Sequence, residues 1–136
     1  MGKGGFIAER LREELDCESS GTILHSFSEA EKEVKKHNPK IIINCIGFTG
    51  QGNVDGCELE KDLTLFANTY MPIILAEVAL RNNMKLVHIS SGCIYHYDYA
   101  RDKPLRETQI PDFIKALKHL IRVDARGIYN VVNKGG

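Results

Sequence analysis

The sequence lacks an excess of charge of either sign, because eighteen basic side chains balance eighteen acidic ones. A domain without net charge has no overall field to attract nucleic acid or an anionic membrane, so neither is expected as a partner. No uninterrupted apolar run reaches the roughly 20 residues that a membrane-spanning helix needs. The opening residues also lack the apolar core of a signal peptide.

Closely spaced metal ligands are missing too. The four cysteines form no C-x-x-C pair, and the five histidines show no ligand spacing. We therefore expect no metal site. Dispersed cysteines in an α/β chain are typical of reduced thiols in a cytoplasmic protein. The cysteines are Cys17, Cys45, Cys57 and Cys93.

What is present is an alternation of two patterns, which predicts an α/β protein. Some segments carry apolar residues at helical spacing, and others are short β-branched runs. Ser28 and Asp112 are the expected N-caps of two helices. The expected helices cover residues 6–15, 28–37, 57–82 and a segment from 112, and the expected strands cover 22–25, 40–46, 85–90 and 128–132. This order predicts βαβ units in a right-handed, doubly wound parallel sheet.

A glycine motif opens the first expected helix. Gly2-Lys3-Gly4-Gly5-Phe6-Ile7-Ala8 has the form G-x-x-G-x-x-G/A. A glycine turn lets backbone N–H groups approach a pyrophosphate, and the N-terminus of the following helix favours its charge. The motif normally follows a strand, whereas here only Met1 precedes it, so a flexible tail is the alternative. The candidate cofactor-binding residues of this motif are Gly2, Lys3, Gly5, Phe6 and Ile7.

Two expected strands end in polar residues, at the edge where open α/β sheets bind ligands. One ends in Asn44-Cys45-Ile46-Gly47, and the other continues into Ser90-Ser91-Gly92-Cys93-Ile94-Tyr95. A serine there can hydrogen-bond a substrate carbonyl, and a cysteine can move a proton. The alternatives are ordinary strand-end capping and, for Cys93, a small buried apolar side chain.

These strand ends, together with Gly52–Glu58 and Asn68–Pro72, resemble the extended short-chain dehydrogenase/reductases that act on nucleotide sugars. Within that family the chain is most similar to 3,5-epimerase/4-reductases and to the reductases that complete dTDP-rhamnose. The resemblance covers residues 2–113 and, as a separate match, 114–136. It implies an enzyme with a Rossmann-type sheet that binds NAD or NADP, here without its first strand and most of its substrate-binding part.

The resemblance also implies roles. Ser91, four residues before Tyr95, matches the catalytic Ser/Thr that hydrogen-bonds the keto oxygen of the sugar. Cys93 matches an acid/base cysteine of relatives that also epimerise. Asn68 supports the active site from the long helix. The remaining candidate cofactor-binding residues are Asn44, Gly47, Asn68 and Ser90.

One family feature is missing, the proton donor in Tyr-x-x-x-Lys. Tyr99–Lys103 has this spelling but lies in a polar stretch before Pro104, where no helix is expected. The sequence after Phe113 resembles a late part of the family. Either residues of a longer protein are omitted, which we favour, or the molecule lacks a proton donor.

Three functions therefore stay open. The first is NAD(P)H-dependent reduction, with or without 3,5-epimerisation, of a nucleotide-linked 4-keto-6-deoxy sugar by a homodimeric enzyme. The second is a non-catalytic NAD(P)-binding or regulatory module, and the third is an inactive fragment. His25-Ser26-Phe27 offers no acid for the ribose of NAD, and Lys3 could hold a 2′-phosphate, so NADP is slightly favoured.

Overall fold

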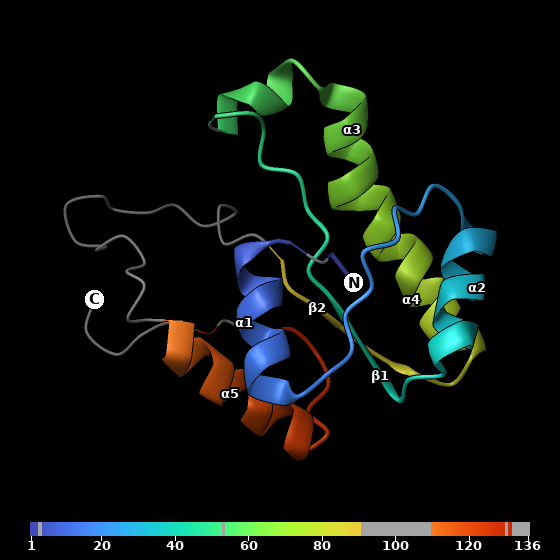
Figure 1. Ribbon diagram of the computed structural model, residues 1–136, viewed down its shortest axis with the longest axis vertical. Helices are drawn as coiled ribbons and strands as arrows, with labels where there is room; N and C mark the ends of the chain where they lie inside the picture. Colours follow the sequence, from blue (N-terminus) through green and yellow to red (C-terminus); the bar gives the residue numbers. More distant parts are fainter. Residues whose placement is uncertain (3, 53, 91–109, 130, 132–136) are drawn as a thin grey trace. The chain divides into compact units, whose positions relative to one another are not determined.

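The computed structural model describes residues 1–2, 4–52, 54–90, 110–129 and 131 (Figure 1). The chain divides into two compact units. Unit 1 comprises Met1–Glu9 and Glu18–Ser90, and unit 2 comprises Arg10–Cys17 and Ser91–Gly136. Helix α1 (Phe6–Leu15), which was predicted over the same residues, begins in unit 1 and ends in unit 2.

The sheet of unit 1 has two parallel strands, β1 (Ile41–Asn44) and β2 (Lys85–His88). Ile41 lies opposite Lys85, and Asn44 lies opposite His88. Both strands were predicted, but each is shorter than its apolar run. Two neighbouring parallel strands joined through a helix form a βαβ unit, so the structure agrees with an α/β fold.

Met1 pairs with β1 on the side away from β2. Its α-amine donates to the backbone oxygen of Ile43 at 3.0 Å, and the N–H of Cys45 donates to its carbonyl oxygen at 3.3 Å. On the other side, β2 bonds to the carbonyl oxygens of Lys40 and Asn44. Met1 therefore occupies the position of the last residue in a strand adjacent to β1.

The connection between β1 and β2 was predicted as one helix over 57–82, but it consists of four parts. Pro72 explains one interruption, because it has no N–H to donate to the carbonyl of Asn68, and the N–H of Met71 bonds to Phe66 in a π turn. Gly56 lies in the first part, a 3₁₀ helix, where a Cβ would come 2.8 Å from the backbone nitrogen of Gln51. The parts are η1 (Val54–Glu58), α3 (Lys61–Leu65), η2 (Phe66–Tyr70) and α4 (Met71–Arg81).

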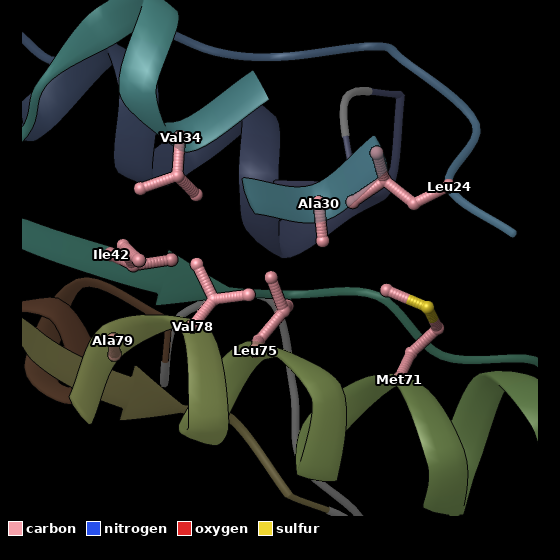
Figure 2. Close-up of a cluster of buried hydrophobic side chains, with 8 residues drawn as sticks. All are labelled: Leu24, Ala30, Val34, Ile42, Met71, Leu75, Val78 and Ala79. Atoms are coloured by element: carbon pink, nitrogen blue, oxygen red, sulfur yellow. The ribbon is translucent and has the colours of Figure 1, made fainter. Parts of the chain in front are cut away.

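The core of unit 1 lies between α4, α2 (Phe27–His37) and β1. Figure 2 shows the side chains of α2 facing those of α4, with Ile42 of β1 beside them. Leu75 and Val78 are fully buried. Burying one such side chain contributes about 1.5–3 kcal/mol. The cluster consists of Leu24, Ala30, Val34, Ile42, Met71, Leu75, Val78 and Ala79.

Helix α2 begins earlier than its sequence suggests. The predicted N-cap was Ser28, whereas Ser26 caps the helix and accepts a hydrogen bond from the N–H of Glu29. The Glu29 carboxylate reaches back to the N–H of His25 at 2.8 Å. Ser26 and Glu29 have the same three-residue spacing as Ser28 and Glu31, so spacing alone could not distinguish the two registers.

Two predicted strands are not observed. Residues 22–25 form no strand, although Leu24 is buried, because a strand requires ladder bonds to a neighbour, and in the described residues the sheet consists of β1 and β2. Residues 128, 129 and 131 are not in a strand either, and Ile128 is 96% exposed. The complete doubly wound sheet is therefore not seen in the described residues.

Unit 2 contains α5 (Ile110–Arg122) and the second half of α1. The helix begins two residues before Asp112, which lies in its first turn and is not its N-cap. Ile114 and Leu117 are buried on one side of α5, as their spacing predicts. Lys118 of α5 pairs with Glu14 of α1 at 3.0 Å.

By length and composition alone, the helix from Lys61 to Arg81 could cross a membrane. In unit 1, however, α4 packs on both strands and on α2. Its buried face contributes Leu75 and Val78 to the core. Packing within unit 1 thus accounts for part of its apolar character, since 28% of this apolar window is buried.

Candidate functional site at the carboxyl edge of the sheet

Gly2 makes the closest backbone contact of the site. A Cβ at this position would lie 2.9 Å from both the carbonyl carbon and the oxygen of Cys45, and the φ of Gly2 is +84°. Both features require glycine. The motif residue that was predicted to form the tight turn therefore rests directly on the end of β1.

The rest of the motif turns into α1 at once. The N–H of Gly5 donates to the carbonyl of Gly2 at 3.4 Å, and the carbonyl of Gly5 accepts from Glu9 at 3.0 Å. Phe6, half exposed, and Ile7 form the first helical turn. A Cβ on Gly5 would meet only the oxygen of Gly2, at 3.7 Å. The glycine motif thus leads into the N-terminus of α1 beside the end of β1.

Asn44 is the one buried polar side chain among the described residues, with 0% of its surface exposed. Its side-chain oxygen accepts from the N–H of Ile46 at 2.9 Å, and its side-chain nitrogen lies 3.1 Å from Nδ1 of His88. Its backbone oxygen accepts from Ile89 at 3.0 Å. Asn44 therefore joins the ends of both strands.

Asn68 holds the next part of the turn from the π segment η2. Its side-chain oxygen accepts from the N–H of Phe48, and its side-chain nitrogen donates to the carbonyl of Phe48, both at 2.8 Å. A Cβ on Gly47 would lie 3.5 Å from the Asn68 oxygen, which is ordinary contact. The predicted supporting role of Asn68 thus has a geometric counterpart, a two-bond clamp on the turn after β1.

The structure brings several predicted site residues to one edge. Gly2 contacts Cys45, Asn68 holds the turn that includes Gly47, and exposed Ser90 follows the end of β2. Lys3, Ser91 and Cys93 lie outside the described residues, as do Tyr99 and Lys103. The roles predicted for all of these residues stay predictions.

Sequence reasoning missed His88 as the partner of Asn44. The two residues end β1 and β2, and their pairing depends on the register between the strands, which the sequence does not contain. Polar residues at equivalent ends of neighbouring parallel strands lie side by side. No cluster of metal-ligating side chains occurs in the parts of the chain that the structure describes.

A shallow cavity of about 210 Å³ lies in unit 2, lined by Lys115, Lys118, His119 and Arg122 of α5. Asp112 pairs with Lys115, and Glu14 pairs with Lys118, so its charge is partly neutralised. None of the predicted site residues lines it. The carboxyl edge in unit 1 is therefore the better candidate site.

The chain is similar to enzymes of rhamnose synthesis. Two trifunctional UDP-glucose 4,6-dehydratase/UDP-4-keto-6-deoxy-D-glucose 3,5-epimerase/UDP-4-keto-L-rhamnose-reductases of Arabidopsis thaliana are 30% and 32% identical to it, over 71% of the chain and 15% of their own length. A bifunctional dTDP-4-dehydrorhamnose 3,5-epimerase/dTDP-4-dehydrorhamnose reductase of the same plant is 29% identical, over 71% of the chain and 34% of its own length.

The chain thus spans no more than 34% of the length of these relatives. No solved structure matches it significantly. The relatives agree with the resemblance to nucleotide-sugar epimerase/reductases that the motifs predicted. Residues 2–114 match the family described as the RmlD substrate binding domain, and the chain belongs to that family.

Proposed function

We propose that this protein takes part in the NAD(P)H-dependent reduction, with 3,5-epimerisation, of a nucleotide-linked 4-keto-6-deoxy sugar. The observation that carries the proposal is the contact of Gly2 with the end of β1, directly before α1 begins. A turn of this kind, next to a helix N-terminus at the carboxyl edge of a parallel sheet, suits a dinucleotide pyrophosphate. The family and the relatives support a nucleotide sugar as the substrate.

The bound nicotinamide supplies the hydride for the C4 carbonyl of the sugar. In the proposal, the hydroxyl of Ser91 donates a hydrogen bond to the keto oxygen and favours the charge that develops there. Cys93 removes and returns protons at the carbons next to the carbonyl. A tyrosine beyond these 136 residues protonates the alkoxide, which completes the reduction.

The finer features are also proposals. The complete protein would have a doubly wound sheet with a strand beside β1, and the pairing of Met1 with Ile43 and Cys45 supports this arrangement. NADP is favoured over NAD because the glycine motif contains Lys3, which would pair with a 2′-phosphate, and His25-Ser26-Phe27 offers no acid for the ribose of NAD. We also propose a cytoplasmic location, on the strength of the dispersed cysteines.

A homodimer is part of the proposal. The helix from Lys61 to Arg81 leaves large apolar side chains exposed opposite its packed face, among them Tyr70 at 51%, Ile73 at 60% and Leu80 at 78%. Their helical spacing produces one stripe that a second copy could cover by two-fold pairing. Sedimentation of the wild type and of Ile73→Glu tests this; a monomer at every concentration contradicts it.

The first experiment is the intact mass of the natural polypeptide. A mass many kilodaltons above 15.3 kDa means that the proton donor lies outside these residues. NADPH oxidation is then followed with the UDP- and dTDP-linked keto sugars. Turnover supports the reductase, whereas no turnover by the intact protein contradicts it. If Cys93→Ser left epimerisation unimpaired, the role of Cys93 would be wrong.

The second candidate is a non-catalytic NAD(P)-binding module, which the missing Tyr-x-x-x-Lys helix favours. It predicts NADPH binding without turnover in the complete protein. A mass near 15.3 kDa, together with a thermal shift on adding NADPH, supports this candidate. A mass near that value without a thermal shift supports the inactive fragment.

A further inference from the structure

Asn44 has only one amide orientation that satisfies its neighbours. Ile46 presents a backbone N–H, which can only donate, 2.9 Å from the side-chain oxygen of Asn44. The other end of the amide is therefore the NH₂ group, and it lies 3.1 Å from Nδ1 of His88. Asn44 is 0% exposed, so its amide depends on these two partners in this structure, although His88 itself is exposed at the end of β2.

This orientation determines the state of His88. An amide NH₂ only donates, so Nδ1 of His88 is the acceptor of this bond and the ring hydrogen lies on Nε2. A hydrogen on Nδ1 would set two donors against each other. Turning the Asn44 amide over would move the same conflict to the N–H of Ile46.

The pair also connects the two strand ends of the candidate site. Asn44 and His88 lie opposite each other in the sheet, and the N–H of Ile89 donates to the backbone oxygen of Asn44 at 3.0 Å. One strand end leads from Ile46 to Gly47, and the other leads to Ser90. A displacement of the Asn44 amide would therefore affect both Ile46 after β1 and His88 at the end of β2.

We propose that His88 is a positioning residue of the carboxyl edge. Its Nδ1 accepts from the Asn44 amide, and Asn44 in turn holds the turn after β1 and the end of β2 in the geometry that a dinucleotide meets. The identity of that ligand rests on the proposed function. The coupling from His88 through Asn44 to Ile46 does not rest on the proposed function. An experiment can therefore disprove the coupling and the proposed function separately.

The test combines amide exchange by NMR with NADPH affinity, at about pH 8, where an ordinary imidazole is neutral. His88→Phe removes the acceptor and leaves a buried NH₂ unpaired. We expect the Ile46 amide to exchange about tenfold faster and NADPH to bind about tenfold more weakly. His88→Asn places an amide oxygen where Nδ1 was and should restore both values to within about threefold of the wild type. His119→Phe, in unit 2, is the control and should change neither.

Unchanged Ile46 exchange in His88→Phe would overturn the proposal. So would a wild-type imidazole ¹⁵N spectrum with the hydrogen of His88 on Nδ1, a measurement that needs no variant. In Asn44→Asp the carboxylate accepts from both neighbours, so the hydrogen of His88 should move to Nδ1, and an unmoved hydrogen counts against the proposal. Faster Ile46 exchange without any NADPH binding to the wild type would uphold the coupling and overturn the dinucleotide as its ligand.

Discussion

The interior of unit 1 and the carboxyl edge of its sheet depend on different interactions. Between α2 and α4, apolar side chains such as Val34, Leu75 and Val78 fill space, and their attraction has little direction. At the edge, Asn44 and Asn68 make hydrogen bonds of 2.8–3.1 Å, and Gly2 tolerates no side chain. In the interior, stability thus depends on side-chain volume. At the edge, the structure depends on hydrogen-bond donors and acceptors and on backbone geometry.

The largest expected effect is in the interior. Leu75 is 0% exposed, so Leu75→Ala removes buried surface and leaves a cavity. We expect a loss of about 3–4 kcal/mol in the free energy of unfolding. Ile23→Ala, at a site of unit 1 that is 76% exposed and lies outside the proposed dimer stripe, should cost less than about 0.5 kcal/mol. Urea denaturation of both variants checks the difference, and equal losses would mean that α4 does not pack as described.

The next effect separates the cost of a positive φ from the cost of a steric clash at the glycine turn. Gly2 and Gly4 both have positive φ, +84° and +99°, but only a Cβ on Gly2 meets backbone atoms. We expect Gly4→Ala to cost about 1–2 kcal/mol from φ strain alone. Gly2→Ala should cost about 3 kcal/mol, since Cys45 must also move, and should abolish NADPH binding. Equal stabilities, measured by denaturation, would mean that the turn does not touch β1.

A smaller effect distinguishes the edge from an ordinary helix end. Asn68→Ala removes both bonds to Phe48 and should cost about 1 kcal/mol, because the site is exposed. Asn82→Ala removes one bond to Val78 and should cost a similar amount. Only Asn68→Ala should also weaken NADPH binding, by about tenfold. Calorimetric titration decides this, and parallel losses of affinity in both variants would argue against a local role for Asn68.

The smallest effect lies outside both regions and depends on pH. The hydroxyl of Ser20 donates to Glu33 at 2.7 Å, and this bond, assisted by Lys36 and His37, lowers the pKa of the Glu33 carboxyl below 4.5 despite partial desolvation. The folded pKa is below the unfolded one, so the stabilisation is present above pH 4.5 and disappears as pH falls through the folded pKa.

Ser20→Ala should therefore be less stable than the wild type at about pH 6, and the gap should close towards about pH 3. Denaturation curves at both values measure the gap. A gap that stays constant with pH would show that the Ser20 hydroxyl does not act through the charge of Glu33.

The interior was more predictable from the sequence than the edge. The β-branched run Ile41–Ile43 and the helical periodicity over 57–82 predicted β1 and α4 close to where they lie, although Ile73, one of the periodic residues, is exposed. Residues 22–25 have the same composition as a strand, but a strand also requires a partner, and composition does not show whether one is present. The interruption at Phe66–Tyr70 follows from Pro72, whereas the apolar periodicity predicted an unbroken helix across it.

At the edge, residue types were predictable and partners were not. The motif identified Gly2 as the tight turn, yet its contact with Cys45 is a tertiary contact across more than forty residues. Asn44 was expected along the cofactor, but its bond to His88 depends on the register of β1 against β2. Short-range spacing contains no information about register, which is why His88 was missed.

The central claim is that the carboxyl edge of unit 1 binds a nicotinamide dinucleotide. NADPH titration of the ¹⁵N-labelled chain tests it most directly, because each backbone amide reports its own surroundings. We predict saturable shifts at Gly2, Gly5, Phe6 and Gly47, with none along α5. No shifts at millimolar NADPH, or shifts confined to Lys115, Lys118 and Arg122, would contradict the account.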